Sequence, residues 1–254
     1  MLQGPRVGTR GVRAPVTTWW IEQGDALIVL AGIGTASIGC VLTDPPYCSG
    51  GSTEADRRQG KVQGLRSSTV AKDGFDWFEG DAMGTAAIVW LLRSVAVEVA
   101  RVLVPGGSFL MFCDWRQVVA LAPAVESAGL RLQNLVVWDK GSFGLGRGFK
   151  PRHELILHLV KGTGDYHDAC TGNVIATKRV RERIHPTEKP VELLRQLLRV
   201  VAAPGAVVLD PFCGSGSTGE AALSEGRCFL GVERSPGYVD VARRRLAAVQ
   251  GVLL

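Results

Sequence analysis

Apolar runs that read as buried strands alternate with helical segments along most of this chain, and this alternation restricts its fold more than any other feature. Short apolar runs predict strands at 17–21, 39–43, 108–113, 132–138, 153–160, 206–210 and 228–233. Helical periodicity and capping signals predict helices at 26–30, 86–103, 115–128, 188–201, 217–224 and 236–249. Strands that alternate with helices build a largely parallel sheet with helices on both faces. The sequence therefore predicts an α/β fold.

Length and composition are those of a soluble globular protein. The chain has 254 residues, of which 46% are hydrophobic and 21% charged. No apolar run approaches the roughly 18 residues that span a membrane, and the N-terminus lacks the apolar core of a secretory signal. We therefore expect a cytoplasmic protein without membrane partners. Residues 1–16, rich in Gly, Pro and Arg, predict a disordered basic arm.

The cysteines and histidines do not form a metal-binding pattern. None of the six cysteines lies in a Cys-x-x-Cys pair, and the four histidines complete no ligand spacing. We expect free thiols in a reducing compartment and no structural metal.

The stretch Asp44-Pro-Pro-Tyr47 ends the predicted strand 39–43. The two prolines lack backbone donors and fix two φ angles, so the strand cannot continue. Asp44 precedes a proline and is pushed toward an extended conformation. The result is a stiff strand end that displays a carboxylate, proline carbonyl oxygens and an aromatic ring. Taken alone, this stretch indicates only a strand followed by a rigid loop.

A second strand runs into a glycine-rich turn and a helix at Asp210-Pro-Phe-Cys-Gly-Ser-Gly216. Gly214 and Gly216 let the backbone turn tightly and approach a ligand ahead of a helix N-terminus. Seventeen residues after Gly216, another apolar strand ends in Glu233, where an acidic side chain is expected to hold ribose hydroxyls. The third glycine of the dinucleotide pattern is missing, which favours a nucleoside cofactor without a pyrophosphate.

The two motifs together resemble those of the amino-DNA methyltransferases that use S-adenosylmethionine. The Asp-Pro-Pro-Tyr motif precedes the Phe-x-Gly-x-Gly motif, which is similar to the β-class order with the catalytic half first. Gly24-Asp25-Ala-Leu27, Phe112-Cys-Asp-Trp-Arg-Gln117 and His185-Pro-Thr-Glu-Lys-Pro190 also match family segments. The resemblance covers roughly residues 17–250 and implies a Rossmann-like methyltransferase fold with a circularly permuted motif order.

The resemblance also implies the site residues. The catalytic residues would be Asp44, Pro45, Pro46 and Tyr47. The residues binding S-adenosylmethionine would be Asp25, Thr187, Lys189, Asp210, Phe212, Cys213, Gly214, Ser215, Gly216 and Glu233. Among these, Glu233 would bind the ribose, Asp25 would lie near the adenine ring, and Thr187 with Lys189 would lie by the methionine carboxylate. Asp25 and Thr187 are each also suited to capping a helix.

The chemistry explains why a carboxylate and prolines are needed together. An exocyclic amine on a base is a poor nucleophile because its lone pair is delocalised into the ring. Asp44 and the carbonyl oxygen of Pro45 could accept the two N–H hydrogens and free that lone pair. The base must first be flipped out of the duplex, and Tyr47 offers a face on which it could stack.

Positive charge is concentrated between residues 140 and 190, where ten Lys or Arg stand against five Asp or Glu. An anionic partner is therefore plausible, and the candidate DNA contacts are Arg147, Lys150, Arg152, Lys178, Arg179, Arg181 and Arg183. We expect one methyltransferase domain at 17–254. It would comprise a catalytic half at 17–160 with a mobile loop at 48–80, a short target-recognition segment at 161–184, and a cofactor half at 185–254.

We expect site-specific methylation of the N6 amine of adenine, because β-class enzymes for cytosine N4 usually carry Ser where Asp44 stands. Cytosine N4 stays the first alternative. Methyltransferases of RNA or protein glutamine use a related motif but normally place the glycine-rich motif first, and a third alternative is a binding module without catalysis. The short recognition segment predicts a short target, a homodimer or help from residues 48–80. A cognate restriction enzyme is a further candidate partner.

Overall fold

The described strands form one mostly parallel sheet. The computed structural model describes residues 18–46, 85–144, 148–168, 170–179 and 188–253. The strand order is β1-β8-β7-β2-β3-β5-β4-β6. The strands are β1 (Trp19–Gln23), β2 (Ile38–Thr43), β3 (Leu103–Cys113), β4 (Arg131–Asp139), β5 (His153–Val160), β6 (Val174–Ala176), β7 (Val207–Asp210) and β8 (Cys228–Glu233). Among these strands, β5 alone runs antiparallel to its neighbours, β3 and β4. The α/β prediction is confirmed.

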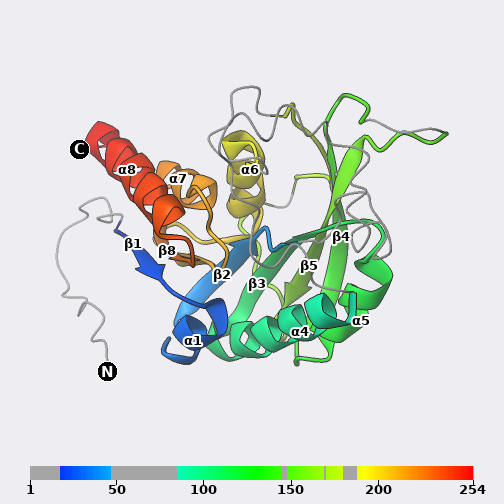
Figure 1. The fold of residues 1–254 in the computed structure, drawn as a ribbon, viewed down its shortest axis with the longest axis horizontal. Helices are drawn as coiled ribbons and strands as arrows, with labels where there is room; N and C mark the ends of the chain where they lie inside the picture. The colour runs from blue at the N-terminus through cyan, green and yellow to red at the C-terminus, as the bar shows by residue number, and fades with distance from the viewer. Residues whose placement is uncertain (1–17, 47–84, 145–147, 169, 180–187, 254) are drawn as a thin grey trace, which may run out of the picture.

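Helices cover both faces of the sheet. They are α1 (Ala26–Ala31), α4 (Thr85–Val102), α5 (Val118–Glu126), α6 (Val191–Val201), α7 (Ser217–Ser224) and α8 (Pro236–Leu253). Helices α1, α4 and α5 lie on one face, and α6, α7 and α8 lie on the other (Figure 1). No helix of the described residues is both long enough and apolar enough to cross a membrane.

The central strands are apolar at successive positions because both of their faces are buried. On β2, Cys40 and Leu42 pack with the cluster that contains Leu197 of α6. Val41 points to the opposite face and packs with the cluster that contains Leu92 of α4. The sheet therefore separates two hydrophobic cores and contributes side chains to both.

The register brings the two predicted motif strands side by side. Strand β2 pairs with β7 through Cys40 and Val208 and through Val41 and Leu209. Strand β7 pairs on its other side with β8. Because these strands are parallel, their carboxyl ends meet at one edge of the sheet. This edge is called the carboxyl edge below.

Two predicted helix starts are wrong. Helix α5 begins at Val118 rather than at Trp115, because the Asp114 carboxylate accepts a hydrogen bond from the Arg116 backbone N–H (2.8 Å) in a preceding turn. Helix α6 begins at Val191 rather than at Glu188, and its N-cap is Pro190. The proline pushes the residue before it out of helical conformation. Thr187, the predicted cap, lies outside the described residues.

Strand β3 begins at Leu103 rather than at Ser108, with a register shift against β2. Gly107 lies within this irregular part, where a Cβ would lie 3.0 Å from the carbonyl oxygen of Gly39. The three-residue strand β6 was not predicted, because so short a segment shows no periodicity. The predicted arm 1–16 and loop 48–80 lie outside the described residues.

Candidate active site at the carboxyl edge

A buried hydrogen bond joins the ends of the two motif strands. Thr43, the last residue of β2, donates from its hydroxyl to Oδ1 of Asp210, the last residue of β7 (2.6 Å). Thr43 is 1% exposed and Asp210 2% exposed. The bond holds the Asp44–Pro45 strand end at a constant position relative to the glycine-rich turn. Tyr47, predicted to stack on the base, lies outside the described residues.

Asp210 organises the turn that follows it. Its Oδ1 also accepts a hydrogen bond from the backbone N–H of Phe212 (3.0 Å). Burial raises the pKa of Asp210 to about 6, although hydrogen bonds from Thr43, Thr218 and Phe212 act in the opposite direction. The carboxylate is thus used inside the protein, and direct contact of Asp210 with a cofactor stays a prediction.

Both glycines of the turn have backbone angles that favour glycine. Gly214 has φ +49°, and Gly216, the N-cap of α7, has φ +82°. A Cβ on Gly216 would lie 3.1 Å from the Cβ of Ala242. The second glycine therefore allows α7 to begin close against α8, while the first shapes the turn next to Glu233.

Backbone donors anchor Glu233 to this turn. Its Oε2 accepts from the Gly214 N–H (2.9 Å), and its Oε1 accepts from the Ser235 N–H (2.8 Å). Burial raises the pKa of Glu233, and the backbone hydrogen bonds limit that rise. A carboxylate accepts about four hydrogen bonds, so Glu233 keeps acceptor capacity after its bonds to Ser235, Gly214 and Arg234. This capacity can serve a ligand hydroxyl.

Two other predicted cofactor residues direct their side chains into the protein. A Cβ on Gly231 of β8 would lie 2.8 Å from Sγ of Cys213, so the thiol packs against that strand. The Ser215 hydroxyl accepts a hydrogen bond from Nη1 of Arg245 (3.1 Å), and Ser215 is buried. If these residues meet a cofactor, their backbone is the part placed to do so.

Asp25 caps α1 and lies beside the Glu233 strand end. Its Oδ1 accepts from the Leu27 N–H (2.9 Å), which confirms the predicted helix cap. The adjacent Gly24 N–H donates to the carbonyl oxygen of Glu233 (3.0 Å). The β1–α1 turn thus borders the same corner of the carboxyl edge, and the proposed proximity of Asp25 to an adenine ring stays a prediction.

Lys189 lies against the predicted catalytic carboxylate. Its Nζ forms an ion pair with Oδ2 of Asp44 and lies 3.4 Å from Oε2 of Glu154. The other oxygen of Glu154 pairs with Nζ of Lys140. Burial alone would lower the pKa of Lys189, but Asp44 and Glu154 outweigh burial and raise it. The four groups form a line of alternating charge, called the charge row below.

Glu154 and Lys140 were missed by the sequence analysis. Glu154 is the second residue of β5, and Lys140 directly follows β4. The one available signal was an acidic residue near the start of a mostly apolar strand. Since β5 runs antiparallel, its start lies at the carboxyl edge, next to Asp44 rather than at the far end of the sheet.

The predicted DNA contacts differ in their surroundings. Lys150 and Lys178 are exposed. Arg152 makes a two-point ion pair with Asp139, with both nitrogen–oxygen distances 2.7 Å. Arg179 lines a cavity of about 200 Å³ at the carboxyl edge, together with Trp115, Lys140 and Glu154. Arg147, Arg181 and Arg183 lie outside the described residues.

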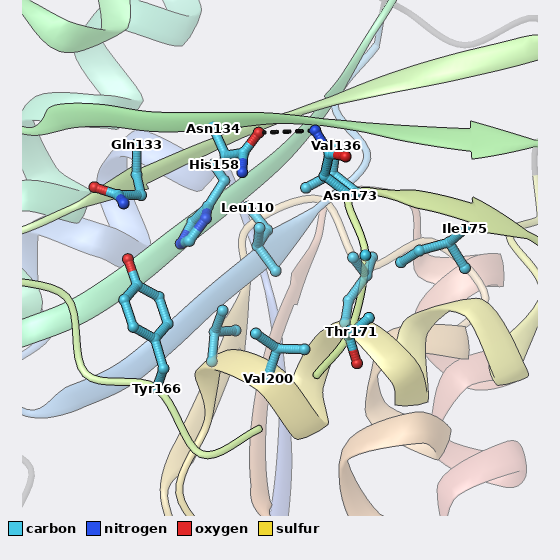
Figure 2. A pocket seen from close by; sticks show the side chains of 13 residues that line it. Leu110, Gln133, Asn134, Val136, His158, Tyr166, Thr171, Asn173, Ile175 and Val200 are labelled. Atoms are coloured by element: carbon cyan, nitrogen blue, oxygen red, sulfur yellow. Dashed lines mark hydrogen bonds between the residues drawn. The ribbon is translucent and has the colours of Figure 1, made fainter. Parts of the chain in front are cut away.

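A second cavity, of about 140 Å³, lies between α6 and the middle of strands β3, β4 and β5. Figure 2 shows Leu110 and His158 on the sheet side of this cavity, with Tyr166 and Val200 facing them. Burial lowers the pKa of His158 to about 4, and its ring forms a hydrogen bond with the Ser108 hydroxyl (3.2 Å). Neither Asp44 nor the charge row lines this cavity, and it is not part of the candidate site.

Known proteins share both the sequence and the fold. YubD of Escherichia coli (strain K12) is 34% identical over 228 residues, which cover 90% of each chain. TTHA0409 of Thermus thermophilus, solved in complex with S-adenosyl-L-methionine, is 25% identical with a TM-score of 0.65, over 92% of this chain and 96% of that one. The cytosine-N4-specific PvuII DNA methyltransferase shares the fold, with 18% identity and a TM-score of 0.70, over 94% and 95% of the two chains.

The family assignment agrees with the geometry of the carboxyl edge and with the predicted motif order. Residues 38–244 match the N6/N4 methyltransferase family, described as DNA methylase. This range includes both the Asp44 strand end and the Glu233 strand end. The chain therefore belongs to the N6/N4 family of DNA methyltransferases.

Proposed function

We propose that the protein transfers a methyl group from S-adenosylmethionine to the N6 amine of an adenine flipped out of DNA. The observation that carries this proposal is the Thr43–Asp210 hydrogen bond (2.6 Å). It places the acceptor carboxylate of Asp44 and the Glu233 turn at neighbouring strand ends. A methyl acceptor and a methyl donor could therefore meet at this edge.

S-adenosylmethionine is the cofactor, and it supplies an electrophilic methyl group when bound. Glu233 would bind the ribose, because its anchored carboxylate keeps acceptor capacity. The backbone of the Phe212–Gly216 turn would approach the nucleoside, and Asp25 would lie near the adenine ring. These assignments agree with the positive φ angles of Gly214 and Gly216.

Asp44 and Pro45 would activate the target amine. The carboxylate and the proline carbonyl oxygen accept the two N–H hydrogens, so that the nitrogen lone pair becomes available. As the new N–C bond forms, the S–C bond breaks and its electron pair stays on sulfur. The nitrogen then loses a proton to the Asp44 carboxylate, which returns it to solvent.

Adenine is favoured over cytosine because Asp44 is a carboxylate. A charged acceptor forms a stronger hydrogen bond to the amine than a serine hydroxyl does, and serine is usual in the β-class cytosine-N4 enzymes that the chain resembles. The similarity to the PvuII enzyme is a similarity of fold alone. The experiment must therefore distinguish methylation of adenine N6 from methylation of cytosine N4.

DNA would be held by the basic part of the chain. We place the catalytic acceptors in the half 17–160, the cofactor site in the half 185–254, and DNA contacts at 161–184 and on the β4–β5 connection. Exposed Lys150 and Lys178 support this division. A homodimer and a cognate restriction enzyme stay predictions.

The test is transfer of labelled methyl from S-adenosylmethionine to unmethylated genomic DNA, RNA and protein in parallel. We expect label in DNA alone, and digestion to nucleosides should yield N6-methyladenine. N4-methylcytosine without N6-methyladenine would overturn the choice of base. Label in RNA or protein but not in DNA would overturn the choice of substrate.

A further inference from the structure

We propose that Lys189 is a positioning residue for methyl transfer, whose ammonium group orients the Asp44 carboxylate and keeps it ionised. The inference rests on the proposed function and adds a residue that acts through Asp44. It also replaces the expectation that Lys189 binds the methionine carboxylate of the cofactor.

The geometry places the Lys189 ammonium between two carboxylates. Its Nζ pairs with Oδ2 of Asp44 and lies 3.4 Å from Oε2 of Glu154. It also lies 5.0 Å from the centre of the Phe112 ring, whose face attracts a cation. The Lys189 side chain is 6% exposed.

The backbone on both sides of this pair is restrained. Asp44 precedes Pro45, and Lys189 precedes Pro190, the N-cap of α6. Residues before proline are confined to extended conformations. The two side chains therefore start from stiff positions on different segments, which suits an ion pair with one constant orientation.

Within the charge row, the positive charge of Lys189 is balanced by neighbouring carboxylates. Asp44 and Glu154 carry two negative charges against the positive charge of Lys189, and Lys140 lies one step further out. The Asp44 charge also raises the pKa of Asp210 on β7. Without Lys189, the negative charges of Glu154 and Asp210 would act on Asp44 with no cation between them. Like charges raise the pKa of a carboxyl group, so Asp44 would be harder to ionise.

A purely structural role explains this arrangement poorly. Removing charges from water is unfavourable, and a buried ion pair often stabilises a fold no better than apolar side chains of similar volume. Phe112 already provides an apolar neighbour at this position. A buried cation held on the catalytic carboxylate is better explained by the state that it imposes on that carboxylate.

The experiment compares Lys189→Met, Lys189→Arg and Lys140→Met with the wild-type enzyme. Single-turnover methylation of unmethylated genomic DNA is measured from pH 5 to 9, and affinity for S-adenosylmethionine is measured by calorimetry. We expect Lys189→Met to lower the rate at pH 7 by about 10- to 100-fold, the usual effect of losing a hydrogen bond to a charged group. The acid limb of its pH profile should move up by about one pH unit or more.

The other variants separate charge from packing. Lys189→Arg keeps the cation and should keep the acid limb in place. Lys140→Met removes a cation one step further from Asp44 and should give a smaller shift. The single variant Lys189→Met leaves buried carboxylates without their cation and could fail to fold. The double variant Lys189→Met with Glu154→Gln removes one charge of each sign and avoids this imbalance. It should still show the raised acid limb.

The outcomes distinguish this inference from the function on which it rests. A wild-type enzyme that leaves DNA unmethylated overturns the proposed function and this inference with it. If the wild type methylates DNA while Lys189→Met keeps an unchanged pH profile, only the inference is overturned. If Lys189→Met instead loses cofactor affinity at an unchanged profile, Lys189 binds the methionine carboxylate.

Discussion

The rigidity of Asp44, the proposed acceptor, has a local cause at the scale of single residues. Two prolines follow it, so the backbone that carries the carboxylate cannot continue as a strand or relax into a helix. Its neighbour Thr43 is buried and hydrogen-bonded to Asp210. The acceptor is therefore in place before a substrate arrives, which is what orienting catalysis requires.

Replacing Asp44 by alanine tests its role in the reaction. Asp44→Ala should lower methyl transfer to DNA by at least about 100-fold, because the amine loses a charge-assisted acceptor that matters mainly in the transition state. Affinity for S-adenosylmethionine should stay within about threefold of wild type. Rate measurements and calorimetry check both expectations, and a variant with normal turnover would remove Asp44 from the catalytic residues.

Asp210 predicts a pH dependence of stability. Burial raises its pKa from 3.8 to about 6. A carboxyl with a raised pKa stabilises the fold at low pH, and that contribution is lost as the pH rises from about 4 through about 6. The change corresponds to about 2–3 kcal/mol.

The variant Asp210→Asn should remove this dependence, since the amide oxygen can still accept from Thr43 and Phe212 and carries no charge to bury. Urea unfolding at pH 4.5 and 7.5 measures it. The variant should gain stability relative to wild type at the higher pH. If the free energy of unfolding changes by the same amount between pH 4.5 and 7.5 in wild type and variant, the pH dependence does not come from Asp210.

At the scale of elements, the connection between β7 and α7 carries the proposed cofactor site. The strand must end, turn and begin a helix within a few residues, and glycines at positive φ allow this. The Gly214 N–H then reaches the carboxylate at the end of β8. The glycine-rich turn and the Glu233 end of β8 thus form one unit. A change in either part would displace the other.

Gly214→Ala tests that unit. A side chain at φ +49° strains the backbone by roughly 1–2 kcal/mol and should displace the N–H that anchors Glu233. Calorimetry should show S-adenosylmethionine affinity reduced by about tenfold or more. The matched control is Gly226→Ala, which has φ +71° with no atom within 4 Å of the added Cβ. Equal cofactor affinities in the two variants would refute a binding role for the turn.

At the scale of the whole molecule, the sheet order assembles one site from distant parts of the chain. Asp44, Glu154, Lys189 and Glu233 come from both predicted halves, yet all lie at the carboxyl edge. The basic residues of the β4–β5 connection and of the segment after β6 follow strands that end at the same edge. Positive charge therefore lies on the side where a DNA backbone would approach.

Salt dependence tests this charge distribution. Replacing Lys178 and Arg179 by alanine should weaken DNA binding and lower the slope of log affinity against log salt by about one unit for each lost phosphate contact. Arg93→Ala is the control and should leave the slope unchanged. Arg93 is an exposed residue of α4, away from the carboxyl edge. An unchanged slope in the double variant would identify Lys178 and Arg179 as solvated surface charges.

Local patterns in the sequence determined much of this protein. The apolar runs identified seven of the strands, because strands buried on both faces are apolar at successive positions. Proline and glycine identified the ends of the β2 and β7 strands, and with them Asp44 and the Phe212–Gly216 turn, since those residues act on their own backbone. The cap at Asp25 was predictable for the same reason.

Only the tertiary structure decided which charges meet. The direction of β5 puts Glu154 at the carboxyl edge, and no local signal gives the direction of a strand in a sheet. Lys189 and Asp44 are 145 positions apart, and their pairing depends on how α6 is placed against β2. An ion pair between segments so far apart in sequence depends on packing, so the charge row could not be derived from local pattern.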